Sequence, residues 1–193
     1  MNMVPILITA VCWLAIDASW LWAGRKIKCT IAPGTQPLPW FKRMYFLVRG
    51  LEFWLLYYLP LSSVPILGWR FIPTRPLLTM LGVLICAAGA GLAIWSRRVL
   101  ARNWNAAATL TENHALVTAG PFGIVRHPIY LGLLLAMIGT ALVIGEVRAL
   151  LPLRNILVAW KKIGAEEGLL RERFPIEYPA YQTRVKRLLP WVL

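Results

Sequence analysis

The sequence is poor in acidic residues and in charge of any kind. It has 8 Asp and Glu residues against 21 Lys and Arg, and only 15% of its 193 residues are charged, whereas 59% are hydrophobic. Soluble domains typically contain about 25% charged residues. A water-soluble fold of this size would lack the polar residues needed to cover its surface. The composition therefore excludes an ordinary soluble domain and favours a membrane protein.

Cysteine is also scarce. The three cysteines, Cys12, Cys29 and Cys86, are odd in number, far apart and without a C-x-x-C pair. The sequence therefore predicts neither a disulfide framework nor a thiolate zinc site, and no other metal site is expected. The excess of Lys and Arg does not indicate nucleic-acid binding, because these residues stand in clusters between apolar runs, which is the pattern of membrane topology.

Long apolar runs are what the chain has instead. They predict an all-α polytopic membrane protein with five spanning helices in one domain of residues 1–193, because a span needs about 20 residues. The spans are expected over residues 4–23, 45–67, 77–95, 129–144 and 149–163. The first is expected to be a retained span rather than a cleaved signal. The fifth is the least regular, because Pro152, Arg154 and Asn155 interrupt it.

The distribution of Lys and Arg predicts the orientation in the membrane. Positive residues are retained on the cytoplasmic side, so five spans with the N-terminus outside place the basic clusters and the C-terminal tail in the cytoplasm. Of the basic residues in the loops, only Arg70, Arg75 and Arg148 fall outside. The segment 103–126 and the tail then share the cytoplasmic side, where a site made from them could use a cytosolic cofactor.

Residues that can carry chemistry gather in two clusters. Both histidines lie in the stretch from His114 to Gly132, which reads H-A-L-V-T-A-G-P-F-G-I-V-R-H-P-I-Y-L-G. The second cluster begins with Lys162, Glu166 and Glu167 and continues through F-P-I-E-Y-P-A-Y. In a helix, Lys162 and Glu166 are four positions apart and therefore share one face, here at the membrane surface.

These clusters, in this order, resemble the isoprenylcysteine carboxyl methyltransferase family and the wider group of membrane phospholipid methyltransferases. The matching motifs cover about the C-terminal half of the chain: N-W, H-x-L-V, R-H-P-x-Y-x-G, E-E and E-Y-x-x-Y with a terminal L-P. The resemblance implies S-adenosylmethionine as cofactor, in a cytoplasmic pocket made by the loop and the end of the last span, with a short C-terminal helix. It implies methyl transfer to a lipophilic acceptor that enters from the bilayer, most simply the carboxylate of a prenylcysteine or of another small hydrophobic acid.

The resemblance also gives roles to individual residues. The cofactor contacts that it implies are His114, Leu116, Val117, Phe122, His127, Tyr130 and Glu166. Glu166 suits the cofactor's ammonium group, and His127 could donate to its carboxylate. Lys162 and Arg126 are the expected catalytic residues. Lys162 stands where the family has Arg, and it lacks the bidentate fork of Arg; Phe122 stands where the family commonly has Tyr, so stacking alone is expected there.

Other functions stay open at this level. An amine or phenol acceptor, as for a phospholipid N-methyltransferase, would need a base, and Glu167 or His127 could serve. Membrane sterol reductases resemble the same C-terminal region and use NADPH, but the chain is short for one and has no extra basic motif for a 2′-phosphate. A non-enzymatic membrane protein, such as a small transporter or assembly factor, would bind neither cofactor.

Structural roles are the alternative for several of these residues. His127 stands before Pro128 and could shape the start of a helix, because Pro favours the first helical position. Glu166 could belong to a solvated helix face. Tyr178 and Tyr181 are expected to pack a tail helix against the body of the protein.

Overall fold

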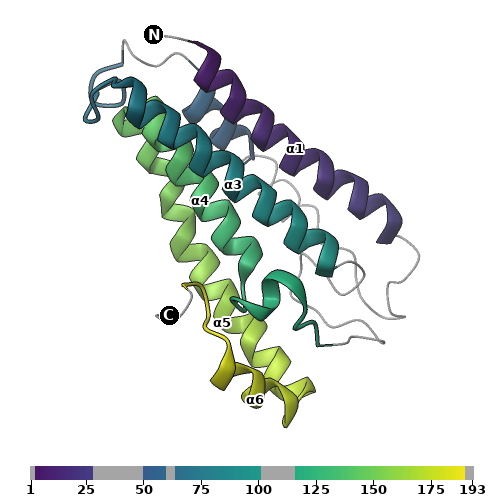
Figure 1. Cartoon of the computed structure of the whole chain (residues 1–193). Helices are drawn as coiled ribbons and strands as arrows, with labels where there is room; N and C mark the ends of the chain where they lie inside the picture. Colours follow the sequence, from purple (N-terminus) through teal and green to yellow (C-terminus); the bar gives the residue numbers. More distant parts are fainter. Residues whose placement is uncertain (1–2, 28–49, 60–63, 101–115, 190–193) are drawn as a thin grey trace.

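A computed structural model describes residues 3–27, 50–59, 64–100 and 116–189 of the chain (Figure 1). Regular structure in these ranges is helical, and β-structure is limited to two isolated bridges, which confirms the predicted all-α class. In chain order the helices are α1 (Met3–Ile27), a helix over residues 50–58, α3 (Pro76–Leu100), η2 (Gly120–Gly123), α4 (Pro128–Ile144), η3 (Val147–Arg154), α5 (Asn155–Arg173) and α6 (Glu177–Arg184).

Two of the predicted spans have the wrong boundaries. α1, α3 and α4 contain the runs expected to form the first, third and fourth spans. Of the second, expected over 45–67, residues 50–58 are helical and residues 65–68 form a turn, while 45–49 and 60–63 lie outside the described residues. The fifth, expected over 149–163, is divided: η3 is a 3-10 helix that contains Pro152, and α5 begins only at Asn155. Pro lacks the backbone N–H that an α-helix interior needs, so the regular helix starts after it.

α3 and α4 pack with their backbones almost in contact. A Cβ atom added to Gly89 would lie 2.5 Å from the backbone nitrogen of Ala136, and one added to Gly139 would lie 2.4 Å from that of Cys86. Glycine at such positions lets two apolar helices approach closely without a side chain between them. α1 lies along this pair, as Figure 1 shows, and Trp13 of α1 donates to the hydroxyl of Thr140 at 3.0 Å.

The outer faces of α1 and α3 are apolar. Met3–Trp22 and Pro76–Leu100 are long and apolar enough to cross a membrane. Only 17% of the most apolar stretch of the first, and 28% of that of the second, is buried inside the protein. Large apolar side chains point away from the bundle; Leu14 and Leu84, for example, are 55% and 60% exposed. Surfaces of this kind suit contact with lipid rather than with water.

At the end of the bundle where α4 stops, a buried acidic residue joins several segments of the chain. Arg148 donates from Nε to Oε2 of Glu146 at 2.7 Å and from Nη1 to the carbonyl of Leu56 at 3.1 Å. Arg70 reaches the same carboxylate at 3.5 Å. Arg148 thereby satisfies carbonyls at the end of the helix over residues 50–58. We call this the Glu146 end.

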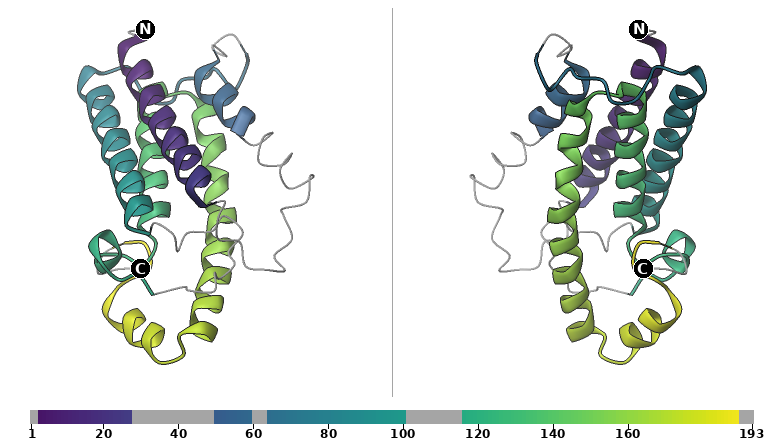
Figure 2. Two further views of the ribbon diagram at one scale, coloured as in Figure 1. Left: turned by 90° about the vertical axis from the view of Figure 1, so that its right-hand side faces the viewer. Right: turned by 90° about the vertical axis from the view of Figure 1, so that its left-hand side faces the viewer.

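Arg154 does not stand alone in an apolar setting, as its place in the predicted fifth span suggested. Its guanidinium is paired with Glu52 of the helix over residues 50–58. The charge that would be expensive within a membrane is thus neutralised by a second helix. The opposite end of the bundle holds η2, the last turns of α5 and the whole of α6, far from the N-terminus (Figure 2).

Candidate functional site

The candidate site begins where α4 begins. His127 is the residue before the helix, and Pro128 occupies its first turn, where a missing N–H leaves no hydrogen bond unmade. Tyr130 follows within the same turn, and its ring lies 5.9 Å from the imidazole of His127, centroid to centroid. Pro128 therefore shapes the helix start, as one alternative predicted, and the same geometry places the two ring side chains together.

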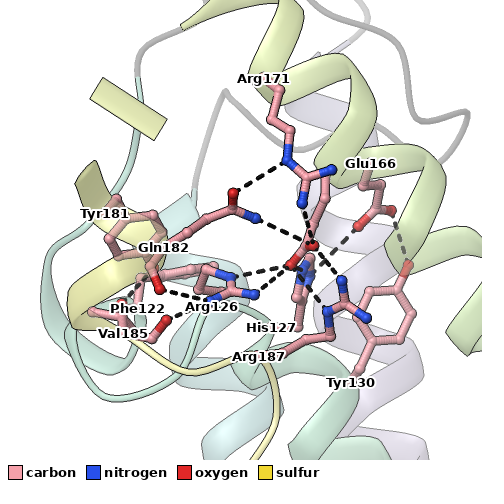
Figure 3. A network of polar contacts seen from close by, with 11 residues as sticks. Phe122, Arg126, His127, Tyr130, Glu166, Arg171, Tyr181, Gln182, Val185 and Arg187 are labelled. Carbon is pink, nitrogen blue, oxygen red and sulfur yellow. Dashed lines mark hydrogen bonds and ion pairs between the residues drawn. The ribbon is translucent and has the colours of Figure 1, made fainter. Parts of the chain in front are cut away.

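α5 brings two acidic residues to these rings (Figure 3). The hydroxyl of Tyr130 donates to Oε1 of Glu166 at 2.9 Å, and Nδ1 of His127 lies 3.8 Å from Oε2 of Glu166. Nε2 of His127 lies 3.2 Å from Oε1 of Glu167. The R-H-P-x-Y motif and the E-E pair thus meet at one end of the bundle, close enough for one small molecule to contact both.

The two adjacent carboxylates differ in exposure. The side chain of Glu166 is 25% exposed, whereas that of Glu167 is 1% exposed. Burial alone would raise the pKa of Glu167, but hydrogen bonds from His127 and Arg187 and the charge of Arg126 hold it well below its usual value. Glu167 therefore stays ionised and is not suited to take a proton as the base for an amine or phenol acceptor.

Arg126 is held within the protein. Its Nε lies 3.0 Å from Oε1 of Glu167, and its Nη1 donates to the backbone carbonyls of Gln182 and Val185. Its side chain is 10% exposed. The guanidinium expected to be catalytic thus joins the loop before α4 to α5 and to the tail, and its catalytic role stays a prediction.

Lys162 lies on α5 one turn before Glu166 and is half-buried. Among the residues that the structure describes, it makes no ion pair or hydrogen bond. Within the described part of the chain, its ammonium group is therefore unpaired and one helical turn from Glu166. The catalytic role of Lys162 stays a prediction.

The remaining predicted contacts come from the segment before α4. Phe122, in η2, is buried at 7% exposure, and its carbonyl accepts a hydrogen bond from Tyr181 at 2.5 Å. Burial raises the pKa of Tyr181 to about 12, so the phenol stays protonated and can donate this hydrogen bond. Leu116 and Val117 are half-buried, while His114 lies outside the described residues.

α6 packs on this segment through aromatic side chains. Tyr178, Tyr181 and Val185 form a buried apolar cluster, against which Leu116 and Phe174 pack. The expectation that the two tyrosines attach a tail helix to the body of the protein is confirmed. Leu116, an expected cofactor contact, also contributes to this attachment.

The tail also supplies residues that sequence reasoning missed. Arg187 donates from Nη2 to Oε2 of Glu167 at 2.6 Å, and its guanidinium lies over the ring of Trp160, 5.2 Å from the centroid. The backbone N–H of His127 donates to the carbonyl of Arg187 at 3.0 Å. The basic composition of the tail was the available signal, but no sequence spacing indicates which basic residue meets which acid.

Comparison with known proteins identifies the family. Residues 77–175, about half of the chain, match the family described as phospholipid methyltransferase. The chain belongs to the phospholipid methyltransferase family. The chain is also similar to a probable protein-S-isoprenylcysteine O-methyltransferase of Oryza sativa subsp. indica, with 34% identity over 88 residues, which are 42% of this chain and 44% of the relative. Protein-S-isoprenylcysteine O-methyltransferase B of Arabidopsis thaliana is 34% identical over 88 residues, 42% of each chain.

This member of the phospholipid methyltransferase family therefore spans less than half the length of the curated relatives it matches. Its fold is similar to that of a eukaryotic intramembrane Ras methyltransferase, isoprenylcysteine carboxyl methyltransferase, with a TM-score of 0.60 and 23% identity over 77% of this chain and 53% of that one. The predicted resemblance is confirmed. That Ras methyltransferase is described as intramembrane, and α1 and α3 of this chain are long and apolar enough to cross a membrane.

Proposed function

We propose that this chain is an S-adenosylmethionine-dependent membrane methyltransferase that acts on a lipophilic acceptor. The observation that carries the proposal is the meeting of His127, Tyr130 and Glu166 where α4 begins and α5 passes it. Membership of the phospholipid methyltransferase family and the O-methyltransferase names of the relatives support the same reaction.

The chemistry of these side chains fits the cofactor. S-adenosylmethionine presents an ammonium, a sulfonium, a carboxylate and a nucleoside. Glu166 is 25% exposed and offers a carboxylate to the cationic groups, and Tyr130 holds that carboxylate in place. We assign Val117 and Phe122 to the apolar wall for adenine; Phe122 has no hydroxyl, so its contact is stacking alone.

When bound, the cofactor supplies a methyl group on a sulfonium, which an acceptor can take by in-line displacement without a metal. The protein has mainly to align the reacting groups, and positioning of this kind can contribute about 7–11 kcal/mol. Lys162 lies on the same face of α5 as Glu166, one turn away, and its charge suits an anionic acceptor. We propose that Lys162 holds the acceptor.

A carboxylate is the acceptor that these residues favour. It is ionised at neutral pH and needs a cation rather than a base. An amine acceptor needs a base, and Glu167 is buried and held in its ionised form by three guanidinium groups. We therefore place a prenylcysteine or another small hydrophobic acid before a phospholipid amine as the substrate class.

We propose further that the chain forms one domain of five crossings, with its N-terminus outside and the site in the cytoplasm. The basic end of α3 and the C-terminal end of α1 lie at the same end of the bundle as α6, and the N-terminus lies at the other (Figure 2). Arg70 and Arg148, two of the three loop arginines expected outside, lie at the Glu146 end. This asymmetry is the one that the positive-inside rule favours.

The test of the function is a product assay. Purified protein is incubated with methyl-labelled S-adenosylmethionine and membrane lipid extract or a prenylated cysteine, and the product is then treated with alkali. A methyl ester releases labelled methanol, whereas an N-methyl product retains its label. We expect released methanol; retained label would assign an amine or phenol acceptor, and no transfer to any fraction would contradict the proposal.

A thermal-shift comparison separates the cofactor classes. S-adenosylhomocysteine, the product form of the cofactor, should raise the unfolding temperature in detergent, because a ligand that binds only the folded state stabilises it. NADPH at the same concentration should not. Protection by NADPH alone would favour a reductase of the sterol reductase type.

A further inference from the structure

We propose that Glu167 is a positioning residue that fixes the imidazole of His127 in one tautomer, with its proton on Nε2, and leaves Nδ1 free to accept a hydrogen bond from a bound ligand. The inference rests on the proposed function only for the identity of that ligand. The geometry of His127 and Glu167 carries the rest.

The first step is the contact between the two side chains. Nε2 of His127 lies 3.2 Å from Oε1 of Glu167, within hydrogen-bond range, and both groups are buried. Arg126 and Arg187 surround the same carboxylate and hold it ionised. An ionised carboxylate can only accept, so the proton of the shared hydrogen bond belongs to Nε2 of the imidazole.

The second step concerns the other ring nitrogen. Nδ1 of His127 faces Oε2 of Glu166 at 3.8 Å, too far for a hydrogen bond. In the neutral ring with Nε2 protonated, Nδ1 is an acceptor. An acceptor nitrogen beside a partly exposed carboxylate suits a donor such as an ammonium or hydroxyl group. The role of His127 is then the reverse of the one expected from sequence, in which it donates to the cofactor's carboxylate.

The third step connects this tautomer to the C-terminal tail. Arg187 binds Glu167 through two nitrogens, Nε at 3.3 Å and Nη2 at 2.6 Å, and its guanidinium is stacked over Trp160. The forked contact restrains both oxygens of the carboxylate. The same residue accepts the backbone N–H of His127 through its carbonyl. The tail therefore orients His127 twice, once along the backbone and once through Glu167.

The experiment is nitrogen NMR of the histidine side chains in the full chain, purified in detergent without cofactor. The chain has two histidines, so His127→Asn assigns the signals of His127 by their loss. We expect wild type to show one tautomer with the proton on Nε2. Glu167→Gln, whose amide can donate as well as accept, should give a mixture of tautomers or the opposite one.

Binding of S-adenosylhomocysteine to the same variants gives the second readout. Loss of the charged partner of His127 should weaken binding about tenfold. Glu172→Gln is the matched control, because Glu172 is an exposed carboxylate on the same helix, and it should leave tautomer and affinity unchanged. Wild-type tautomer and affinity in Glu167→Gln would overturn the proposal.

Variants of Arg187 test the proposal if Glu167→Gln does not fold. Arg187→Gln should disturb the His127 signals and weaken binding, whereas Arg187→Lys should restore part of both; Arg173→Gln, at an exposed position, is the control. Unchanged signals in Arg187→Gln would remove the tail from the proposal. If wild type binds no S-adenosylhomocysteine, the proposed function fails, yet the tautomer measurement still decides the role of Glu167.

Discussion

Each end of the helix bundle has a buried carboxylate that is paired with arginine side chains, but the surroundings of the two carboxylates differ. At the Glu146 end, a carboxylate that is 4% exposed is met by Arg148 and Arg70. At the other end, Glu167 is 1% exposed and is met by Arg126 and Arg187. Arg171 is a third guanidinium group near Glu167, at 3.7 Å. In both places a buried acid and the guanidinium groups around it join segments that lie far apart in the sequence.

The difference between the ends lies in what surrounds the buried acid. At the Glu146 end, the other hydrogen bonds of Arg148 go to backbone carbonyls. At the other end, Glu167 also holds an imidazole, and the next residue, Glu166, keeps a partly exposed carboxylate. A buried ion cluster by itself indicates structure. A cluster that also orients His127 beside a second, accessible acid indicates a binding site.

The largest expected effect is a loss of stability at the Glu146 end. Among the described residues, Arg148→Met leaves buried Glu146 with only its longer ion pair to Arg70, and breaking a buried pair in this way costs about 3–5 kcal/mol. We expect a loss of that size in the free energy of unfolding, measured by denaturant titration in detergent. Arg75→Met, at an exposed position, should change it by less than about 0.5 kcal/mol.

The protein that remains folded in Arg148→Met should bind S-adenosylhomocysteine with wild-type affinity, because the change is confined to the end without the candidate site. An affinity that falls together with stability, after correction for the folded fraction, would mean that the two ends are not separate. A stability equal to that of wild type would show that Glu146 is not a buried structural centre.

A smaller effect is expected between the two ends, in the contact of α3 with α4. Gly89→Ala places a Cβ 2.5 Å from backbone atoms of Gly132 and Ala136 and should cost about 1–3 kcal/mol. Gly91→Ala on the same helix meets nothing within 4 Å and should be neutral or stabilising by up to about 1 kcal/mol. Equal unfolding temperatures for the two variants would contradict the packing described for these helices.

The smallest expected effect is a loss of ligand affinity at the candidate site, without a loss of stability. Tyr130→Phe removes the hydroxyl that donates to Glu166 at 2.9 Å, so the carboxylate is less well held. We expect affinity for S-adenosylhomocysteine to fall roughly 3–10-fold, with little change in unfolding temperature. Tyr58→Phe, which removes a phenol bonded to Thr9 instead, is the control and should bind as wild type does.

Much of the fold and the central contact of the site could be predicted from the sequence. The apolar runs that became α1, α3 and α4 are nearly continuous, so their hydrophobicity and length identified them. His127 and Glu166 could be expected to meet because each stands next to the end of a predicted span on the same side of the membrane. These inferences depend only on hydrophobicity and on the alternation of spans.

The rest depends on packing that a sequence does not show. α5 continues from its apolar part through Glu166 and Glu167 to Arg173 because the tail covers one of its polar faces, whereas hydrophobicity alone ended the predicted span at residue 163. Glu167 rather than Glu166 is buried because the rotation of α5 about its axis turns Glu167 toward the tail. The partner Arg187 stands 20 residues beyond Glu167, with no periodicity to link them.

The most direct measurement is a calorimetric titration of the purified, folded protein with S-adenosylhomocysteine, for wild type and for Glu166→Gln. The account predicts saturable binding at one site in wild type and at least tenfold weaker binding when the Glu166 carboxylate loses its charge. No binding by wild type, or equal affinity in the two proteins, would contradict it.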